Sequence, residues 1–327
     1  MYFYLIGIDY KTAPIEVRDI IYRDRQAITT VWENDPARQA SVIITCNRIE
    51  LYGLAEDTAE AAQKIKGFFK RYPDFSRFGY VRYGQAAVLR HALRVACGLE
   101  SQLKGELQIL AQVKTWSGRR IFHPELRRLW EEAIAVAQEI RYQTGLNEAS
   151  TNIATIAFHD LKKRLNIQKS ADIVVIGTGK IAELAAQYRP DFFELNFIAH
   201  KNYEKAKTLA KVSGGRAALF IGLPQLLSAA DAVISATSSP HYILKKEHFP
   251  AVLKRRRNPL YLYDLALPRD IEPALRDMEG LVLLNLDDFN EAFNEHNLKN
   301  QQKIALASYL VEERLKNCTE CADVKGY

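Results

Sequence analysis

Cysteine is scarce in this chain. Four cysteines occur among 327 residues: Cys46, Cys97, Cys318 and Cys321. A secreted protein held together by disulfides carries a denser set, so a disulfide framework is excluded and each cysteine is expected to be a thiol in a reducing compartment. A free thiol of this kind can serve as a reactive group.

Long apolar runs and targeting signals are also lacking. No apolar run approaches the roughly 18 residues of a membrane-spanning helix. The N-terminus, Met1-Tyr2-Phe3-Tyr4-Leu5, lacks the basic region and the longer apolar stretch of a signal peptide. We therefore expect no membrane association and a cytoplasmic location.

Glycine and proline are not enriched. The chain has 16 Gly and 11 Pro, with 48% hydrophobic and 26% charged residues. This composition is that of an ordinary globular protein and excludes collagen, disorder and repeat arrays. At about 100 to 200 residues per domain the length predicts two domains, which is enough for an enzyme.

The net charge of +6 is modest but unevenly distributed. Between Gln63 and Arg128 there are fourteen Lys and Arg residues and four Asp and Glu residues, an excess of ten positive charges. Such an excess favours contact with the phosphates of RNA or DNA. Solvated helix faces account for the charge equally well, because basic stretches are common in proteins that bind no nucleic acid.

The N-terminal part alternates short apolar strands with helical stretches. In chain order it predicts strand, helix, strand, strand, helix and strand at Phe3–Ile8, Arg25–Asn34, Ser41–Thr45, Glu50–Ala55, Thr58–Arg71 and Tyr80–Tyr83. This βαββαβ order is typical of a ferredoxin-like α+β domain. Apolar residues at helical spacing from Ala86 to Leu165 predict added helices that form a layer on the sheet.

The pattern changes at Ala171. Continuously apolar strands alternate with helices, at Ile173–Ile176, Leu195–Ala199, Ala232–Ser235 and Leu260–Asp264. This α/β pattern predicts a parallel, Rossmann-like sheet with helices on both faces. From Asp287 to Lys316 we expect one long amphipathic helix, followed by a frayed tail. The predicted domains are residues 1–150, residues 151–286 and a C-terminal helix at 287–327.

A glycine pattern follows the first strand of the second domain. The strand runs directly into Gly177-Thr178-Gly179-Lys180-Ile181-Ala182, where a helix begins. In the GxGxxA dinucleotide fingerprint, the first glycine permits a tight turn and the second lets a pyrophosphate approach the backbone. We interpret these six residues as cofactor-binding: Gly177, Thr178, Gly179, Lys180, Ile181 and Ala182. A structural glycine turn is the alternative.

The end of the next strand indicates which nicotinamide cofactor is bound. An acid at this place binds the ribose 2′-hydroxyl of NAD, whereas a base accepts the 2′-phosphate of NADP. The strand ends in Ala199-His200-Lys201-Asn202, and the first acid is Glu204. Lys201 therefore favours NADPH, unless it only occupies an exposed helix start.

Cys46 lies at the end of an expected strand, in Ile44-Thr45-Cys46-Asn47-Arg48. A loop at this place would present the thiol, and Arg48 would help to keep it ionised. A buried core cysteine accounts for the same position, since Cys-x-Arg by itself is a weak signal.

Five stretches resemble one known family. They are GIDYKTAP at residues 7–14, TCNRIELY at 45–52, GLES at 98–101, GELQILAQVK at 105–114 and DLALPRDIEP at 264–273. Together they are similar to glutamyl-tRNA reductase, which makes the first committed precursor of tetrapyrroles. The resemblance runs in the same order from about residue 3 to about residue 300.

The resemblance implies a two-step reduction. Cys46, at the position of the family's nucleophile, would attack the ester carbonyl that joins glutamate to tRNA(Glu), giving a thioester and free tRNA. Hydride from NADPH would then convert the thioester to glutamate-1-semialdehyde. The implied enzyme is an NADP-dependent oxidoreductase of porphyrin biosynthesis. Its implied partners are charged tRNA(Glu) and glutamate-1-semialdehyde aminomutase.

The resemblance also implies roles for other residues. His91 would assist as a general acid or base, although a core histidine is the alternative. Arg48 would anchor the substrate's side-chain carboxylate, and Glu106 would hold its α-ammonium group. The remaining substrate-binding positions that the resemblance implies are Thr12, Thr45, Asn47, Ser101 and Gln108.

In the second domain, Thr237 and Ser238 match the family loop that passes the cofactor. Their hydroxyls suit ribose and phosphate contact, although a turn before proline needs no ligand. We expect no metal site. Cys318 and Cys321 have CxxC spacing but supply only two ligands, with no histidine close by, so two incidental thiols are expected.

Three positions depart from the family's usual residues: Ile49 replaces Thr, Leu107 replaces Pro and Gln143 replaces Glu. They keep open a paralogue that binds tRNA or NADPH without completing the reduction. A plain NADP-dependent dehydrogenase of a small metabolite is a third interpretation. The presence of Cys46, Arg48, His91 and the GxGxxA fingerprint favours the reductase over both.

The family continues after its long helix into a helical dimerisation domain, whereas this sequence stops about forty residues past Asp287. We expect the apolar residues of the long helix to pack along the chain's own domains, and therefore a monomer. A second copy of the chain is the alternative partner for these residues.

Overall fold

The computed structural model describes the backbone of residues 1–33, 39–45, 47–120, 123–146, 151–166, 170–254 and 256–323, without the side chains of 31–33, 118–120 and 317–323. The chain divides into two compact units. Unit 1 comprises residues 1–150 and 293–327, and unit 2 comprises residues 151–292. The C-terminal segment therefore groups with the N-terminal part of the chain.

Unit 1 contains a four-stranded antiparallel sheet in the order β2-β3-β1-β4. Its strands are β1 (Tyr2–Asp9), β2 (Ala40–Ile44), β3 (Arg48–Ala55) and β4 (Tyr80–Tyr83). The long central pair β1 and β3 aligns Asp9 with Arg48, so the end of β1 lies beside the start of β3. The four strands fit the predicted ferredoxin-like arrangement.

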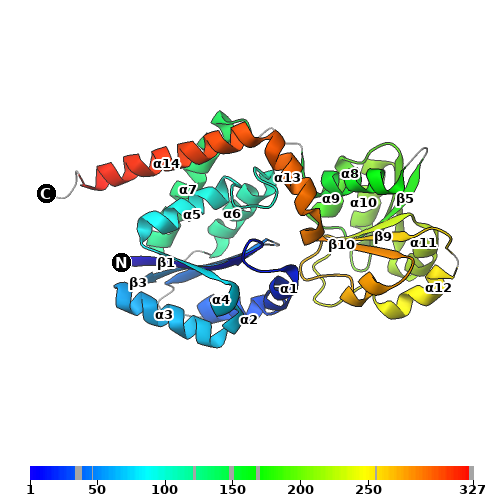
Figure 1. The fold of residues 1–327 in the computed structure, drawn as a ribbon, viewed down its shortest axis with the longest axis horizontal. Coiled ribbons are helices and arrows are strands. Elements are labelled where there is room, and N and C mark those ends of the chain that lie inside the picture. Colours follow the sequence, from blue (N-terminus) through cyan, green and yellow to red (C-terminus); the bar gives the residue numbers. More distant parts are fainter. Residues whose placement is uncertain are drawn as a thin grey trace. The chain divides into compact units, whose positions relative to one another are not determined.

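Helices cover both faces of this sheet (Figure 1). On one side lie α5 (Gln85–Ala96), α6 (Leu107–Arg120) and α7 (Pro124–Gln143), and on the other lie α1 (Ile15–Arg23), α2 (Arg25–Glu33), α3 (Thr58–Arg71) and α4 (Pro73–Phe78). Successive strand residues point to opposite faces, so Phe3 and Leu5 join the core with α5–α7, while Tyr4 and Ile6 join the other core. The sequence did not indicate α1 as a separate helix.

Unit 2 contains a six-stranded parallel sheet in the order β10-β9-β8-β5-β6-β7. Its strands are β5 (Ala171–Ile176), β6 (Phe193–Ala199), β7 (Arg216–Leu219), β8 (Ala232–Ser235), β9 (Leu260–Asp264) and β10 (Leu281–Asn285). The order reverses between β5 and β8, as in a doubly wound dinucleotide-binding sheet. The Rossmann-like prediction is confirmed, and β7 and β10 are two strands that the sequence analysis missed.

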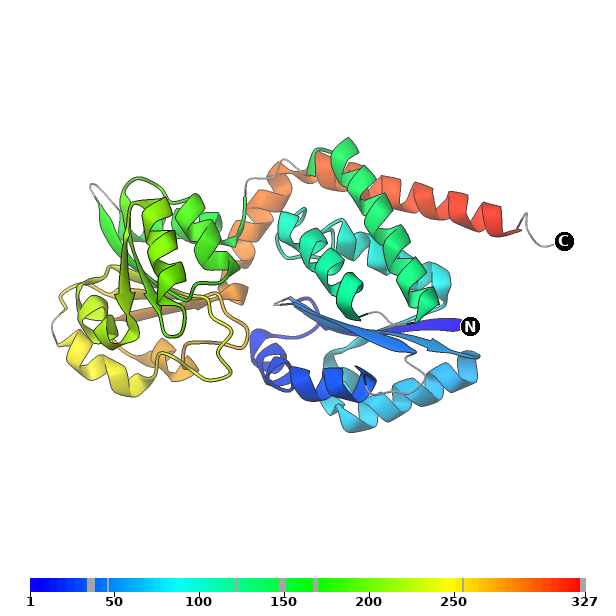
Figure 2. The same cartoon turned by 180° about the vertical axis from the view of Figure 1, so that it is seen from behind.

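Helices flank this second sheet on both sides, as Figure 2 shows from behind. They are α8 (Ile153–Leu165), α9 (Lys180–Gln187), α10 (Tyr203–Ser213), α11 (Leu223–Ala229) and α12 (Phe249–Leu253). One core lies between the sheet and α11–α12 and includes Val174, Val233 and Leu262. This core keeps the carboxyl ends of β5 and β8 side by side.

The C-terminal segment differs from the single helix expected over residues 287–316. It contains a short 3-10 turn at Leu286–Phe289, then α13 (Asn290–Lys299) and α14 (Gln301–Asp323), with a break at Asn300. The side-chain Nδ2 of Asn300 donates to the backbone carbonyl of His296 at 3.1 Å, and the backbone N–H of Asn300 donates to the same carbonyl at 3.2 Å. The frayed tail expected at residues 317–327 is wrong for residues 317–323, since α14 continues to Asp323, and the last four residues lie outside the described ones.

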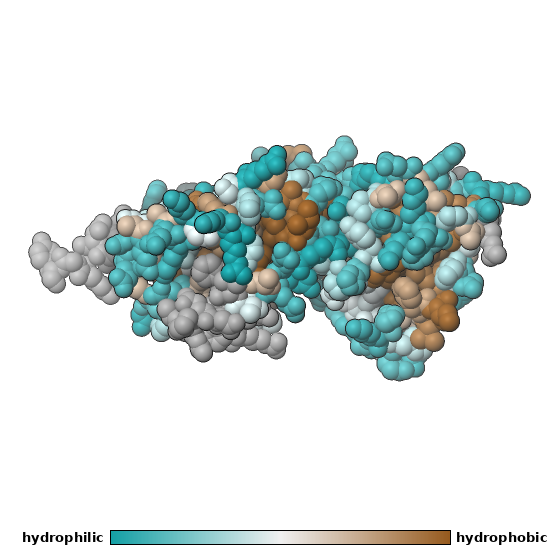
Figure 3. Space-filling view, turned by 90° about the horizontal axis from the view of Figure 1, so that it is seen from below, coloured by the Kyte–Doolittle hydropathy of each residue, from teal (hydrophilic) through white to brown (hydrophobic). Residues whose placement is uncertain are grey.

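In the described ranges, no helix has the length and apolarity needed to cross a membrane. Figure 3 shows one face of the molecule, where hydrophilic residues predominate and apolar residues form small patches. Among the same described residues there is no group of three or more His, Cys, Asp or Glu side chains that could hold a metal ion.

Candidate active site

The connection between β2 and β3 carries the expected nucleophile. Cys46 itself lies outside the described residues. The hydroxyl of Thr45 accepts hydrogen bonds from the backbone N–H groups of Asn47 and Arg48, both at 3.2 Å. The Asn47 carbonyl accepts from the backbone N–H of Tyr10 at 3.1 Å. Both sequence neighbours of Cys46 are therefore held in place, and the Thr45 hydroxyl is engaged in the turn.

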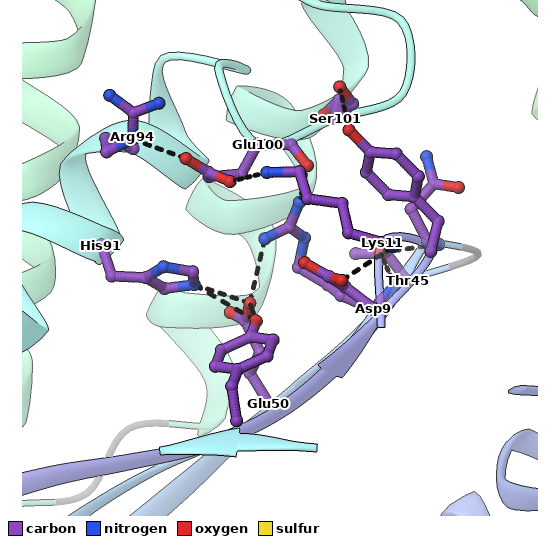
Figure 4. A network of polar contacts seen from close by, with 12 residues as sticks. Asp9, Lys11, Thr45, Glu50, His91, Arg94, Glu100 and Ser101 are labelled. Atoms are coloured by element: carbon purple, nitrogen blue, oxygen red, sulfur yellow. Dashed lines mark hydrogen bonds and ion pairs between the residues drawn. The ribbon is translucent and has the colours of Figure 1, made fainter. Parts of the chain in front are cut away.

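Glu50 is the centre of a buried charged cluster (Figure 4). Its carboxylate accepts hydrogen bonds from Arg48 Nη1 at 2.9 Å and from His91 Nε2 at 2.8 Å. The hydroxyls of Tyr52 and Tyr80 donate to it at 2.8 Å and 2.5 Å. Glu50 is fully buried and His91 is 6% exposed, so the whole cluster is shielded from solvent. Four donors thus converge on one carboxylate.

The neighbours of Glu50 keep it charged. Burial by itself would raise its pKa, but the charges of His91 and Arg48 outweigh burial and hold the pKa of Glu50 well below its ordinary range. Burial would likewise lower the pKa of Arg48, and the Glu50 carboxylate reverses this and raises it. The pKa values of Tyr52 and Tyr80 are raised well above the ordinary value, mainly by burial and next by Glu50. Both phenols therefore stay neutral donors.

The cluster also sets the proton position on His91. An imidazole whose Nε2 faces a carboxylate keeps a proton on that nitrogen, which leaves Nδ1 as the acceptor or the second proton site. In the described part of the chain nothing bonds to Nδ1. The sequence analysis named His91 and Arg48 but missed Glu50. The available signal was spacing, because Arg48, Glu50 and Tyr52 alternate along β3 and so share one face.

A loop of residues 97–106 joins α5 to α6, and we call it the substrate loop because it carries Ser101 and Glu106. The carboxylate of Glu100 pairs with Lys11 and with Arg94 Nε at 2.5 Å (Figure 4). Burial raises the pKa of Glu100, but Lys11 and Arg94 outweigh this and lower it to about 2. The loop is therefore tied to the residues after β1 by the partly buried ion pair of Lys11 and Glu100.

Glu106 differs from Glu50 and Glu100, whose carboxylates are paired with cations. Its carboxylate forms no hydrogen bond or ion pair with a described residue. Burial raises its pKa to about 7, although the charges of Arg141 and Arg48 act in the opposite direction. A carboxyl group in this state gains most from an added cation, because the cation would favour its ionised form.

Other expected substrate residues lie in different surroundings. Ser101 is buried, and its carbonyl accepts from the Tyr10 hydroxyl at 3.2 Å. Gln108 is half-buried in the first turn of α6. Thr12 is exposed, and its hydroxyl accepts from the backbone N–H of Asp9 at 3.2 Å. Thr12 therefore serves a turn at the end of β1.

In unit 2, the glycine fingerprint follows β5 at the point where strand order reverses. Gly177 has φ +111°, and a Cβ there would lie 2.6 Å from the carbonyl oxygen of Ala236, so only glycine fits. A Cβ on Gly179 would meet nothing nearer than the same oxygen at 3.8 Å, which leaves open space at the N-terminus of α9. Ala182 is fully buried. This arrangement fits a pyrophosphate group.

The remaining expected cofactor residues surround this cradle. Lys201 is exposed at the end of β6, and no described residue forms an ion pair with it. By contrast, Lys180 and Lys205 pair with Glu183 at 3.5 Å and 2.7 Å. Ile181 is half-buried in the first turn of α9, and Thr178 precedes it in the loop. Unlike Lys180 and Lys205, Lys201 therefore has no ion pair with a described residue and can bind an anionic ligand.

Thr237 forms hydrogen bonds with other residues of unit 2. Its backbone N–H and its hydroxyl donate to Asp270 at 2.8 Å and 2.6 Å, and the hydroxyl accepts from the backbone N–H of Ser239 at 3.0 Å. Ser238 is exposed. The sequence analysis missed Asp270 and also Asp264, whose Oδ2 accepts from the backbone N–H of Ile271 at 2.9 Å.

Two protein families match the chain by their sequence models. "Glutamyl-tRNAGlu reductase, N-terminal domain" matches residues 6–144, and "Shikimate / quinate 5-dehydrogenase" matches residues 159–292. A glutamyl-tRNA reductase from Pelobacter propionicus is 32% identical over 95% of this chain and 74% of its own length. The chain belongs to the glutamyl-tRNA reductase family.

Further relatives carry the same name. A glutamyl-tRNA reductase from Aquifex aeolicus is 30% identical over 92% of this chain and 77% of its own. A solved structure of glutamyl-tRNA reductase from Methanopyrus kandleri is 25% identical, covers 97% of this chain and 79% of its own, and superposes with a TM-score of 0.47. The sequence matches to the reductases of Pelobacter propionicus and Aquifex aeolicus confirm the resemblance found in the motifs, and the dehydrogenase match assigns a nicotinamide cofactor to unit 2.

The three departures from the reductase family's usual residues lie away from the charged cluster. Ile49 is buried in the core on the opposite face of the sheet. Leu107 is 44% exposed. Gln143 is exposed and donates to Glu139 at 3.3 Å. None of these three side chains contacts Glu50 through a hydrogen bond within the described residues.

The basic segment of this reductase is partly neutralised. Among its described residues, cations that form ion pairs include Lys64 with Glu60, Arg90 with Glu312, Arg94 with Glu100 and Arg128 with Glu125. The exposed cations without such a pair on α3, α4 and β4 are Lys66, Lys70, Arg71, Arg77 and Arg82. We call these five residues the basic strip. Arg77 and Arg82 also stack on Phe78 and Tyr80, at 4.9 Å and 5.5 Å from the ring centres.

Proposed function

We propose that this chain reduces glutamyl-tRNA(Glu) to glutamate-1-semialdehyde with NADPH, through a thioester on Cys46. The observation that carries the proposal is the buried cluster of Arg48, Glu50 and His91, which begins two residues after Cys46 in a chain of the glutamyl-tRNA reductase family. Unit 1 would perform glutamyl transfer, and residues 151–286 of unit 2 would bind the cofactor.

In the first step, the Cys46 thiolate adds to the ester carbonyl carbon of glutamyl-tRNA. The bond between that carbon and the ribose oxygen breaks, and the oxygen leaves with a proton. His91 Nδ1 is the group that would hold or deliver this proton, because Glu50 fixes the other ring nitrogen. The cationic Arg48 near Cys46 in the sequence would favour the ionised thiol.

Two buried polar atoms support a glutamate pocket next to Cys46. Arg48 Nε and Asn47 Oδ1 are both buried and have no hydrogen-bond partner among the described residues. A buried polar group without a partner is unfavourable, so a ligand that pairs with it binds well. Arg48 Nε would bind the substrate's side-chain carboxylate, and Glu106 would receive its α-ammonium group. Thr45, Ser101 and Gln108 would complete the pocket.

The second step needs a hydride for the thioester carbonyl, and NADPH would supply it when bound to unit 2. The carbon–sulfur bond then breaks, the thiolate of Cys46 is regenerated and the aldehyde leaves. Gly177, Gly179 and the N-terminus of α9 would bind the pyrophosphate, and Thr178, Lys180 and Ser238 would line it. Lys201 would accept the 2′-phosphate, which supports NADPH over NADH.

The proposal extends to partners. The basic strip would contact the phosphates of tRNA(Glu), and glutamate-1-semialdehyde aminomutase would receive the product. The basis for a monomer is α14, which buries Ala307, Val311 and Leu315 against α5 and α7 of its own unit. Light scattering at micromolar concentration should therefore give the mass of one chain.

Mass spectrometry without NADPH tests the function. Charged tRNA(Glu) should leave a glutamyl adduct on Cys46 of the wild type, and Cys46→Ser should carry none. Cys97→Ala is the matched control, because Cys97 is buried and burial raises its pKa to about 12. Addition of NADPH should replace the adduct by free glutamate-1-semialdehyde. Absence of adduct and aldehyde would reject the proposal, and an adduct that persists with NADPH would favour the non-reducing paralogue.

A further inference from the structure

Asn297 of α13 contacts the substrate loop, although the two are far apart in the sequence. Its Oδ1 accepts a hydrogen bond from the backbone N–H of Lys104 at 3.0 Å. Its Nδ2 donates to the backbone carbonyl of Gln102 at 3.0 Å. One side-chain amide therefore binds the backbone on both sides of Leu103, which is buried. The Asn297 side chain thus supplies the donor and the acceptor that the backbone of a neighbouring strand would otherwise supply.

The carbonyl that Asn297 binds directly follows two other carbonyls that accept side-chain hydrogen bonds, the first of them from Arg48 of the charged cluster. The Glu100 carbonyl accepts from Arg48 Nη2, and the Ser101 carbonyl accepts from the Tyr10 hydroxyl at 3.2 Å. Three consecutive carbonyls are thus each held by a side chain from a different part of the chain. Because the three peptide groups are covalently linked, a shift at Gln102 changes the hydrogen-bond geometry at Arg48.

The ends of the substrate loop are held independently of Asn297. Arg141 Nη1 donates to the carbonyl of Cys97 at 2.7 Å, and Arg141 Nη2 donates to that of Gly105 at 2.9 Å. The backbone N–H of Gly105 also donates to the Gly98 carbonyl at 3.0 Å. Loss of Asn297 would therefore leave both ends of the loop closed and remove two of the hydrogen bonds that hold its middle, which carries Ser101.

We propose that Asn297 is a positioning residue for glutamyl transfer, acting through the substrate loop on Arg48 and Ser101. This inference rests on the proposed function. The side-chain amide is suited to this role because its Nδ2 donates one hydrogen bond and its Oδ1 accepts the other. Alanine supplies neither, and aspartate keeps the acceptor but places a second oxygen against the Gln102 carbonyl.

The test compares Asn297→Ala with Asn300→Ala in the full chain. Asn300 is the matched control, since its amide bonds within the helix, to the His296 carbonyl at 3.1 Å. The rate of adduct formation on Cys46 without NADPH should fall about tenfold in Asn297→Ala, as expected when a partly buried pair of hydrogen bonds is lost. NADPH affinity, measured by fluorescence titration, should stay unchanged in both variants.

Hydrogen exchange supplies a readout that needs no activity. The amide of Lys104 should exchange faster in Asn297→Ala, while the amides of α5 and α7 should keep their protection. Asn297→Asp retains one of the two hydrogen bonds and serves as the second variant if the alanine variant fails to fold. It should show the same slower adduct formation.

Three results would overturn the inference: an unchanged adduct rate in Asn297→Ala, unchanged Lys104 exchange, or an equal loss in Asn300→Ala, which would indicate general weakening of the helix. A wild type that forms no adduct would instead count against the proposed function. In that case the Lys104 exchange still decides whether Asn297 holds the loop.

Discussion

Glu50 in unit 1 and Asp264 in unit 2 are both carboxyl groups shielded from solvent, at 0% and 1% exposure. Glu50 is bonded to Arg48 and His91, and its pKa lies well below the ordinary range. Asp264 lies near a second carboxyl group, Asp270, and burial together with that charge raises its pKa to about 8. At neutral pH, Glu50 is therefore an ionised carboxylate, whereas Asp264 is mostly a neutral carboxylic acid.

The difference shows that burial alone does not decide ionisation. Burial raises the pKa of both groups, and the sign of the neighbouring charges decides the outcome. In unit 1 the resulting anion orients a histidine and an arginine. In unit 2, Asp270 instead binds Thr237, which follows β8 next to the glycine cradle.

The largest effect is expected from Glu50→Gln. The change removes the charge that holds Arg48 and His91, leaving a buried guanidinium without its ion pair. We expect the free energy of unfolding to fall by about 3–5 kcal/mol, with near-complete loss of adduct formation. Chemical denaturation measures the first quantity. Tyr52→Phe is the control, since it removes one donor to Glu50 but leaves the charge, and it should cost far less.

Asp264→Asn should change how stability depends on pH. The pKa of Asp264 is about 8 in the folded protein and about 3.9 in an unfolded chain. The folded state therefore binds the extra proton, and this contribution is complete below about pH 4 and is lost as pH rises to about 8, by about 1.4 kcal/mol per unit.

Denaturation curves measured between about pH 5 and 8 give the free energy of unfolding at each pH. This free energy should decline more steeply with pH for the wild type than for Asp264→Asn. The exposed Asp191 provides the control, and Asp191→Asn should keep the wild-type slope. Equal slopes in all three proteins would mean that Asp264 is ionised in the folded state, like Glu50.

Glu106 contrasts with Glu50 within unit 1, because the Glu106 carboxylate has no ion pair with a described residue. Its pKa of about 7 means that it ionises as pH rises through neutrality. If its anion receives the substrate ammonium, kcat/KM for glutamyl-tRNA should rise across that range by about tenfold per pH unit at most. Glu106→Gln should be slower and should lack this rise. The ionisation of the substrate itself is common to both proteins, so the difference between their profiles reports Glu106.

The smallest effect is expected at Lys201, an exposed cation in contrast to the buried Arg48. Lys201→Asp should lower the preference for NADPH over NADH by about tenfold, the value of one charge-assisted hydrogen bond. Steady-state kinetics with each cofactor measures this. Lys211→Asp, on the far end of α10, should leave the preference unchanged. Equal use of both cofactors by the wild type would remove the basis for this prediction.

Local patterns explain why much of the architecture could be predicted. The apolar runs at β5, β6, β8 and β9 and the fingerprint at Gly177 are short-range signals, so strand, turn and helix follow from neighbouring residues. β7 was missed because it is a short edge strand with only half-buried and exposed residues. The break at Asn300 was missed because apolar periodicity continues through it.

The sequence by itself determined the family motifs, the order of the two units and the identity of Arg48, His91 and the glycine cradle. Tertiary structure decided which charges meet. Glu50 and His91 are 41 residues apart and become partners only when α5 packs on the sheet of unit 1. Asn297 and Lys104 are separated by 193 residues and pair only when α13 reaches the substrate loop. Charge state and hydrogen-bond pairing depend on neighbours in space, and a linear sequence does not state which residues those are.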